Sequence, residues 1–465
     1  MSLHTALSAV DTGLDASLKR LFDLLRIPSI STQAAHAPDC RAAANWLVDT
    51  LHDMGFTAST RETPGHPMVV AHAKGPHGSP HVLFYGHYDV QPVDPLTLWR
   101  SAPFEPVLVE GPTGEKEITA RGAADDKGQV MTFIEACRAL KQADGTLPLS
   151  VTLLIEGEEE SGGINLLPFL EANTEELKAD VALICDTGML GRGLPAITTM
   201  LRGMVGEEVT ITAANRDLHS GMYGNAARNP IQVLCDIVAD LRDGATGRVT
   251  LPGFYDGVPD IDPQTRALWG KIGPSDAQSL GPVGLSLAAG EQGYTALEQT
   301  WCRPSCEING ISGGYEENGF KTVLPAKAMA KVSFRLVGTQ DPEAIRAAFR
   351  AHVQARLPAD CTADFVAHGG SRASLVPTTM PFLPPALKAL EAEWQQPAAV
   401  IGCGGSIPVV TEIQQALGMD SLLIGFGLDD DRVHSPNEKY DLSCFHKGTR
   451  SWVRVLYALA GKNPD

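Results

Sequence analysis

The stretch Val151–Gly163, VTLLIEGEEESGG, joins an apolar run to a cluster of glutamates. The run LSVTLLI is rich in β-branched and aliphatic residues without polar alternation, which predicts a strand buried on both faces of a mainly parallel sheet. In open α/β sheets, ligands bind just beyond the carboxyl ends of the strands. A metal-binding and proton-transferring cluster is one interpretation of the acidic run, and a solvated loop is the other. The glutamates concerned are Glu156, Glu158, Glu159 and Glu160.

Upstream, HVLFYGHYDVQP (81–92) predicts another buried strand that ends in His87 and Asp89. A carboxylate two residues after a histidine can accept the proton of the far imidazole nitrogen and so fix the tautomer that binds a metal. The His-x-Asp pair alone is weak evidence, because a core or surface histidine is commoner.

Between these strands, TARGAADDKGQVMTFIEACRAL (119–140) places Asp125 and Asp126 at the start of a predicted helix. The helix dipole favours anionic side chains there, and an N-cap would account for one aspartate. The pair therefore indicates a further role.

Downstream, the apolar run of DVALICDTG (180–188) ends in Asp186, and HSPNE (434–438) follows another predicted buried strand. His434 is placed as a ligand would be, although an exposed loop histidine is the ordinary alternative. Several strands thus end in metal-binding side chains, which favours one shared site. Those of the first three strands are His87, Glu159/Glu160 and Asp186.

The composition is that of a soluble, globular protein. Its 465 residues suggest two domains, and 43% hydrophobic with 20% charged residues is typical of a folded protein. With 37 Lys+Arg against 55 Asp+Glu, the net charge of −18 disfavours nonspecific binding to nucleic acid or to anionic membranes.

The cysteines and the N-terminus suggest the cytoplasm. The nine cysteines include no C-x-x-C pair, so neither a disulfide framework nor a thiolate zinc site is indicated. No stretch reaches the ~18 apolar residues of a membrane span, and the start lacks the basic and apolar regions of a signal peptide. We expect a cytoplasmic protein with reduced cysteines and no membrane or nucleic-acid partner.

The order of predicted elements changes near residue 203. From there to about 373 the pattern reads β-α-β-β-α-β, a split βαβ (ferredoxin-like) α+β domain, with 251–300 expected as a long loop. The α/β pattern then resumes. We predict an α/β domain of two segments, 1–202 and 374–465, with a smaller domain inserted at 203–373.

Eight motifs follow one another along the chain in this order: YGHYDVQP, RGAADDKG, EGEEESG, ICD, DLHSGMYGN, KTVLPAKAMAKVSFRLV, GCGGSIP and HSPNE. Together they resemble the motifs of the dinuclear zinc metallopeptidases of the carnosine dipeptidase (cytosolic non-specific dipeptidase) type. Relatives in that superfamily are carboxypeptidase G, acetylornithine deacetylase, succinyl-diaminopimelate desuccinylase and aminoacylase. This family resemblance implies that the two-segment domain, 1–202 and 374–465, is a catalytic domain and that the inserted domain, 203–373, is a lid and dimerisation domain.

The resemblance implies two divalent metal ions per subunit, bridged by Asp125. His87 and Asp186 would complete one metal site, and Glu160 and His434 the other. Nitrogen and oxygen ligands without thiolate suit zinc first, then manganese or cobalt. The resemblance also implies a cis peptide between Asp125 and the next residue.

The remaining implied roles concern catalysis and substrate. Glu159 would be the general base, Asp89 would orient His87, and His219 would reach across a homodimer to stabilise the oxyanion. Arg335 would bind the terminal carboxylate of the substrate. Three more residues are expected in the same pocket: Thr322, His368 and Ser406.

The predicted function is metal-dependent exopeptidase cleavage of dipeptides or very short peptides, by a homodimer formed through the inserted domain. A deacylase of N-acyl amino acids is the alternative within the superfamily. A binuclear phosphoesterase is disfavoured because no phosphate-binding GxxxxGK[ST] loop is present. A catalytically dead scaffold would be expected to lose Glu159 or a ligand, and none is missing.

Overall fold

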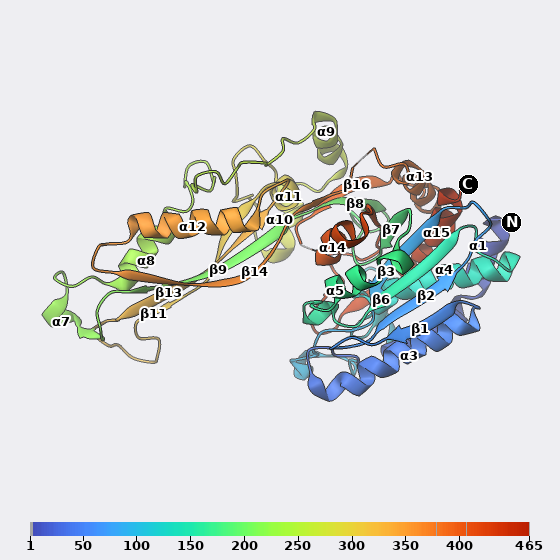
Figure 1. Cartoon of the computed structure of the whole chain (residues 1–465), viewed down its shortest axis with the longest axis horizontal. Helices are drawn as coiled ribbons and strands as arrows, with labels where there is room; N and C mark the ends of the chain where they lie inside the picture. The colour runs from blue at the N-terminus through green and yellow to red at the C-terminus, as the bar shows by residue number, and fades with distance from the viewer. Residues whose placement is uncertain (1–2, 378, 406, 465) are drawn as a thin grey trace. The chain divides into compact units, whose positions relative to one another are not determined.

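A computed structural model describes residues 3–377, 379–405 and 407–464. The chain divides into two units. The first unit comprises residues 1–199, 376–401 and 409–465, and the second comprises 200–375 and 402–408. Each unit is built around a sheet of its own (Figure 1).

The sheet of the first unit is mainly parallel in its centre, as the unbroken apolar runs predicted. β6 pairs in parallel with β3, β3 with β7, and β7 with β17, whereas the outer pairs are antiparallel. The carboxyl ends of the central strands therefore meet at one edge. The strand order is β1 (Thr57–Arg61), β2 (Met68–Ala73), β6 (Ser150–Glu156), β3 (His81–His87), β7 (Val181–Ile184), β17 (Ser421–Leu423), β8 (Ala196–Leu201) and β15 (Ser374–Leu375), and β16 (Ala399–Cys403) also pairs with β8.

Aromatic residues join the centre of this sheet to two long helices. Phe84 of β3 stacks on Phe133 of α4 (Lys127–Asp144) with ring centroids 3.8 Å apart. Trp452 of α15 (Leu442–Leu459) contacts both rings edge-on, at 5.9 Å and 5.2 Å. This cluster fixes α4, and with it the residues that precede α4, against β3. The helices α1 (Leu3–Thr12), α2 (Leu14–Leu25) and α13 (Leu383–Trp394) pack around α4 and α15, and α3 (Ala37–Asp53) packs on β1 and β2.

Shorter elements complete the first unit. A three-stranded sheet has the order β18–β5–β4, and single-turn or two-turn helices follow the strands. Strands β8 and β16 pass from one unit into the other. The bounds are β4 (Val107–Glu110), β5 (Lys116–Thr119), β18 (Lys439–Asp441), β16 (Ala399–Cys403), α5 (Leu166–Ala172), α6 (Thr174–Leu177) and α14 (Pro408–Leu417).

The second unit contains a four-stranded antiparallel sheet whose elements follow the predicted β-α-β-β-α-β order. Residues alternate along β9 and β13 between a buried face, packed with α8 and α12, and a more exposed face. The predicted fold class, a mainly parallel α/β domain with a smaller α+β domain, is confirmed. The spatial order is β11 (Ser305–Gly313), β13 (Lys327–Leu336), β9 (Gly203–Thr212) and β14 (Thr362–Ser371), with α8 (Pro230–Ala239) and α12 (Pro342–Arg356) on one face.

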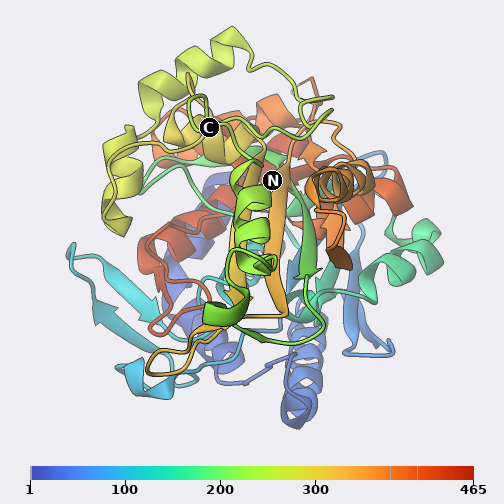
Figure 2. The ribbon, with the colours of Figure 1, turned by 90° about the vertical axis from the view of Figure 1, so that its left-hand side faces the viewer.

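The long loop expected at 251–300 is wrong, because this segment forms α9 (Pro263–Ile272), α10 (Asp276–Leu280) and α11 (Ala296–Cys302). These helices are drawn in olive to yellow in Figure 2. Ser275 and Thr295 each make a capping box with the residue three positions later, and this reciprocal bonding stabilises a short helix. Both capping-box patterns are present in the sequence, but the high glycine and proline content of the segment favoured the prediction of a loop.

The nine cysteines are all free in the structure. Most are buried, where a thiol packs as a small apolar group. Among the helices of the described ranges, none combines the length and the apolar character needed to cross a membrane.

We expect Trp452→Ala to lower the free energy of unfolding by about 3–5 kcal/mol, because it leaves a cavity among the packed aromatic rings. Urea denaturation followed by far-UV circular dichroism measures the loss. Leu108→Ala is the control: its side chain on β4 is 40% exposed, so the change should stay within about 0.5 kcal/mol. Equal losses in the two variants would contradict the role given to the aromatic cluster.

Candidate metal centre

The parallel strand ends of the first unit deliver candidate ligands to one place. His87 is the last residue of β3 and lies opposite Glu156, the last residue of β6. Asp186 follows β7 by two residues, and β7 is the other parallel neighbour of β3. The helix α4 begins directly after Asp125 and Asp126, so its start brings a further carboxylate to the same edge.

Two groups of side chains could each hold a metal ion. Ligand atoms of His87, Asp125 and Asp186 all lie within 4.8 Å of one another, and so do those of Asp125, Glu160 and His434. The two carboxylate oxygens of Asp125 face different histidines: Oδ1 is 3.0 Å from His87 Nε2, and Oδ2 is 2.9 Å from His434 Nε2. His434 Nε2 also lies 3.2 Å from Glu160 Oε2. Asp125 is thus shared by both groups.

Asp89 connects the two groups from the side opposite Asp125. Its carboxylate Oδ2 accepts a hydrogen bond of 3.0 Å from the backbone N–H of Glu160. His87 Nδ1 is 3.1 Å from the Asp89 carbonyl oxygen and 3.3 Å from Asp89 Oδ1. Both oxygens can therefore accept the Nδ1 proton, which leaves Nε2 of His87 for a metal.

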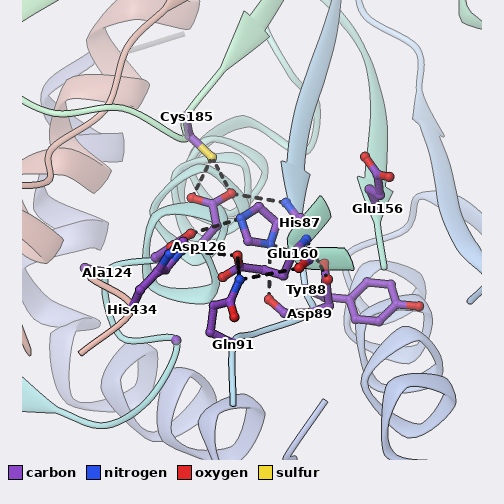
Figure 3. A network of polar contacts seen from close by, with 12 residues as sticks. His87, Tyr88, Asp89, Gln91, Ala124, Asp126, Glu156, Glu160, Cys185 and His434 are labelled. Atoms are coloured by element: carbon purple, nitrogen blue, oxygen red, sulfur yellow. Dashed lines mark hydrogen bonds and ion pairs between the residues drawn. The ribbon is translucent and has the colours of Figure 1, made fainter. Parts of the chain in front are cut away.

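Asp125 and Asp126 are adjacent in the chain but serve different surroundings. The peptide between them is cis, as the family resemblance implied. Asp126 is buried, and its Oδ2 accepts hydrogen bonds from the backbone N–H of His87 (3.1 Å) and from the thiol of Cys185 (3.3 Å). Figure 3 shows Asp126 between Cys185 and His87. Asp126 thus fixes the end of β3, while Asp125 faces the candidate ligands.

The four glutamates of the acidic run also differ. Glu156 is buried and accepts a hydrogen bond of 2.6 Å from the hydroxyl of Tyr85; in Figure 3 its side chain lies apart from the network. Glu158 is buried as well and accepts from the side-chain amide of Asn165. The acidic run is therefore not a solvated loop. Glu160 joins a candidate metal group, whereas Glu159, one residue earlier, belongs to neither group found among the described residues.

The electrostatics of the cluster favour bound cations. Burial raises the pKa of Glu159 and of Asp186, and the neighbouring carboxylates raise both further. Burial opposes ionisation of Asp125 too, but hydrogen bonds from His434 and His87 hold its pKa below the usual range. Hydrogen bonds to Asp125 and Glu160 raise the pKa of His434 to about 10. Divalent cations would relieve this crowding of like charges, and imidazole and carboxylate donors without thiolate suit zinc. The donor set therefore fits a metal centre.

The candidate substrate residues lie in the second unit. His219, at the end of β10 (Leu218–His219), caps the single-turn helix α7 (Ser220–Tyr223) by accepting the N–H of Gly221 at its Nδ1. Thr322 precedes β12 (Val323–Leu324), which pairs with β10, so His219 and Thr322 are neighbours in one small ladder. Both are exposed.

Arg335 and His368 lie on the two strands that flank β9. Arg335 of β13 pairs with Met204 of β9, and His368 lies where the register of β14 against β9 shifts. His368 Nε2 is 4.0 Å from Glu208 Oε2. Ser406 lies outside the described residues.

Sequence reasoning missed two residues of the first unit. Gln91 donates a hydrogen bond of 2.8 Å from its amide to Glu160 Oε2, and its signal was its place in YGHYDVQP. Glu438 is buried beneath the start of α4, and its signal was its place in HSPNE. Glutamine is not a typical metal ligand, and the buried contacts of Glu438 are made with residues more than three hundred positions earlier in the chain.

The model of peptidase family M20/M25/M40 matches residues 83–458 of the chain, a range that includes every ligand candidate. The chain belongs to this peptidase family. It is 30% identical to the Cys-Gly metallodipeptidase of Candida albicans over 461 residues, covering 95% of this chain and 94% of the relative. It is 27% identical to the Beta-Ala-His dipeptidase of Homo sapiens, covering 85% and 78%.

A solved structure supports the same assignment. Human carnosine dipeptidase 1 superposes with a TM-score of 0.82 at 25% identity, covering 99% of each chain. The expected resemblance to the carnosine dipeptidase branch is confirmed, and so is the predicted enzyme class, a metallopeptidase of that branch.

We expect Gly157→Ala to disturb the glutamate segment, because the new Cβ would lie 2.1 Å from the Tyr88 hydroxyl oxygen. Tyr88 is held by its hydrogen bond to the Pro67 carbonyl, so the segment itself must move. A loss of about 1–3 kcal/mol in stability is expected, together with lower kcat/KM. Gly191→Ala, whose Cβ would meet only Leu194 Cδ1 at 3.8 Å, is the control. Unchanged melting and activity in Gly157→Ala would refute this constraint.

Proposed function

We propose that this enzyme hydrolyses dipeptides or very short peptides with two divalent metal ions per subunit, zinc before manganese or cobalt. The observation that carries the proposal is the sharing of Asp125 between two candidate metal groups. His87 and Asp186 would complete one metal site, and Glu160 and His434 the other. The relatives named for Cys-Gly and Beta-Ala-His substrates support a dipeptide as the substrate class.

Ions bound there supply Lewis acidity, which lowers the pKa of a water molecule and polarises the peptide carbonyl. Glu159 is then the general base that accepts the proton and returns it to the leaving amine. Two observations support this role: Glu159 is adjacent to a proposed ligand without joining either candidate group, and burial raises the pKa of its carboxyl above the ordinary value for glutamate. Asp89 orients His87, which is consistent with the two oxygens it offers to His87 Nδ1.

The second unit would bind the substrate. Arg335 is proposed to hold the terminal carboxylate through a bidentate guanidinium pair. His219 is proposed to stabilise the oxyanion in the active site of the partner subunit. The other residues proposed for the pocket are Thr322, His368 and Ser406.

A homodimer formed through the second unit is supported by exposed apolar side chains on its sheet. Ile308 and Ile311 on the edge strand β11 are 39% and 50% exposed, and Val366 on the opposite edge strand β14 is 54% exposed. Edge strands present unpaired backbone groups, and apolar side chains exposed on them are candidates for contact with a second copy of the chain. The free thiols support a cytoplasmic location.

A panel of free-amino dipeptides and N-acyl amino acids, assayed with zinc, manganese and cobalt, tests the substrate class. Turnover of the dipeptides is the expected result. Preference for the N-acyl amino acids would overturn the proposal in favour of a deacylase.

We expect Glu159→Gln to retain both metal ions and to lose about 10²–10⁴-fold in kcat, because only proton transfer is removed. Glu160→Gln should instead lower the metal content. Inductively coupled plasma mass spectrometry of the two purified variants, beside steady-state kinetics, separates the roles. Reversed metal contents would assign the base and the ligand the other way round.

We expect Arg335→Ala and His219→Ala to be inactive without loss of metal, and their mixture to regain activity when subunits exchange. Recovery follows because a heterodimer of the two variants keeps one site with both residues, if each site takes Arg335 and His219 from different chains. Native mass spectrometry establishes that heterodimers form. If they form and activity does not return, both residues act within one chain.

A further inference from the structure

Glu438 receives an unusual set of hydrogen bonds for a buried carboxylate. Its side chain is fully buried, and each of its two oxygens accepts two donors. Oε1 accepts the backbone N–H groups of Ala124 (2.9 Å) and Asp125 (3.0 Å). Oε2 accepts the backbone N–H of Gly122 (2.9 Å) and Nη1 of Arg121 (2.7 Å). The carboxylate thus holds the turn that ends in Asp125.

The same residue also belongs to the loop that carries His434. Glu438 follows His434 by four residues, and its backbone carbonyl accepts the N–H of Ala120. His434 and Asn437 both have positive φ angles, of 60° and 63°. Asn437 anchors the loop between His434 and Glu438, because its amide donates to the Leu98 carbonyl and its oxygen accepts the Arg100 N–H, each at 2.8 Å. One loop therefore presents His434 and supports Asp125 at once.

The simpler explanation of the buried Glu438 is that its charge neutralises that of Arg121. Arg121 is itself buried and also donates to the Pro92 carbonyl. Only one of the four donors to Glu438 is Arg121, however, and the other three are backbone N–H groups of the turn before α4. A counter-ion alone would not require these three bonds. They point to control of the backbone that carries Asp125.

We propose that Glu438 is a positioning residue of the metal centre, which fixes Asp125 and the His434 loop relative to each other. This inference rests on the proposed function. Because Asp125 belongs to both candidate groups, a displaced Asp125 weakens both metal sites, whereas loss of His434 would weaken one. Outer partners that orient metal ligands typically contribute 10–100-fold to metal affinity or activity.

The test is Glu438→Gln, which keeps the side-chain size but turns an NH₂ group toward two of the four donors. We expect both stepwise zinc dissociation constants, measured by chelator competition on the folded protein, to rise about 10–100-fold. The absorption spectrum of the cobalt-loaded variant should change as well, since it reports ligand geometry. Glu438→Asp, which keeps the charge on a shorter side chain, replaces Glu438→Gln if that variant does not fold, and its affinities should change in the same direction.

Two comparisons separate positioning from general stability. Glu135→Gln is the matched control. Glu135 is a buried carboxylate on α4 that accepts hydrogen bonds from Arg20 of α2, and it makes none of the contacts that Glu438 makes with the Asp125 turn. It should lower the melting temperature and leave both zinc constants unchanged. The double variant Arg121→Met/Glu438→Gln should bind zinc as weakly as Glu438→Gln, because at least one of the three backbone donors still faces an NH₂ group in place of its acceptor.

The outcomes distinguish this inference from the proposed function. A wild-type protein that binds fewer than two zinc ions would refute the proposed metal centre itself. If the wild type binds two ions and folded Glu438→Gln binds them equally well, Glu438 is not a positioning residue. Recovery of affinity in the double variant would show instead that Glu438 acts as the counter-ion of Arg121.

Discussion

The crowding of carboxylates around Asp125 is the constraint on which the first unit depends. Asp125 approaches one histidine with each oxygen, and Asp186 and Glu160 each lie close enough to Asp125 to hold a metal ion together with it. Like charges held so close raise one another's pKa and oppose folding unless cations offset them. The surrounding structure must therefore hold the carboxylates in a geometry in which bound cations stabilise the folded protein by more than burial of the carboxylates destabilises it.

The parallel sheet holds some of these side chains in place, and hydrogen bonds between loops hold the others. Strand β3 fixes His87 because it is paired on both sides and packed against α4 through Phe84. The segments beyond the strand ends have no such ladder. They are fixed by contacts among themselves: Asp89 with the Glu160 backbone, Gln91 with the Glu160 carboxylate, and Glu438 with the Asp125 turn. The precision of the centre thus depends on residues that are not ligands.

The proposed role of the second unit is to bind the substrate. Its sheet is covered on one face by α8 and α12, and the other face carries Arg335 beside more exposed neighbours. A cation such as Arg335 suits a terminal carboxylate, which is the feature that all dipeptides share. In this proposal the first unit carries the residues for hydrolysis. The second unit binds the terminal carboxylate and so limits the length of the substrate. Such a division would allow side-chain preference to vary without disturbing the metal ligands.

The sequence by itself determined the elements and the residue types of the site. Unbroken apolar runs predicted the central parallel strands, the β-α-β-β-α-β order predicted the second unit, and the strand ends indicated His87 and Asp186. The predicted strands are confirmed because periodicity is a local property. His87 and Asp186 remain predicted ligands, which the structure places in one candidate group. The short helices at 263–302 were missed, since their capping boxes lie in a glycine- and proline-rich segment.

Local pattern left open how chemically identical neighbours divide their roles; the family resemblance implied Asp125 and Glu160 as ligands, and the tertiary structure supplied the contacts that distinguish the neighbours. Asp125 faces the candidate ligands while Asp126 fixes the end of β3, and Glu160 joins a metal group while Glu156 bonds Tyr85. Glu438 gained its place from donors more than three hundred positions earlier in the chain. In irregular segments the direction of a side chain is set by partners distant in sequence, so local pattern can name the candidates but cannot assign them.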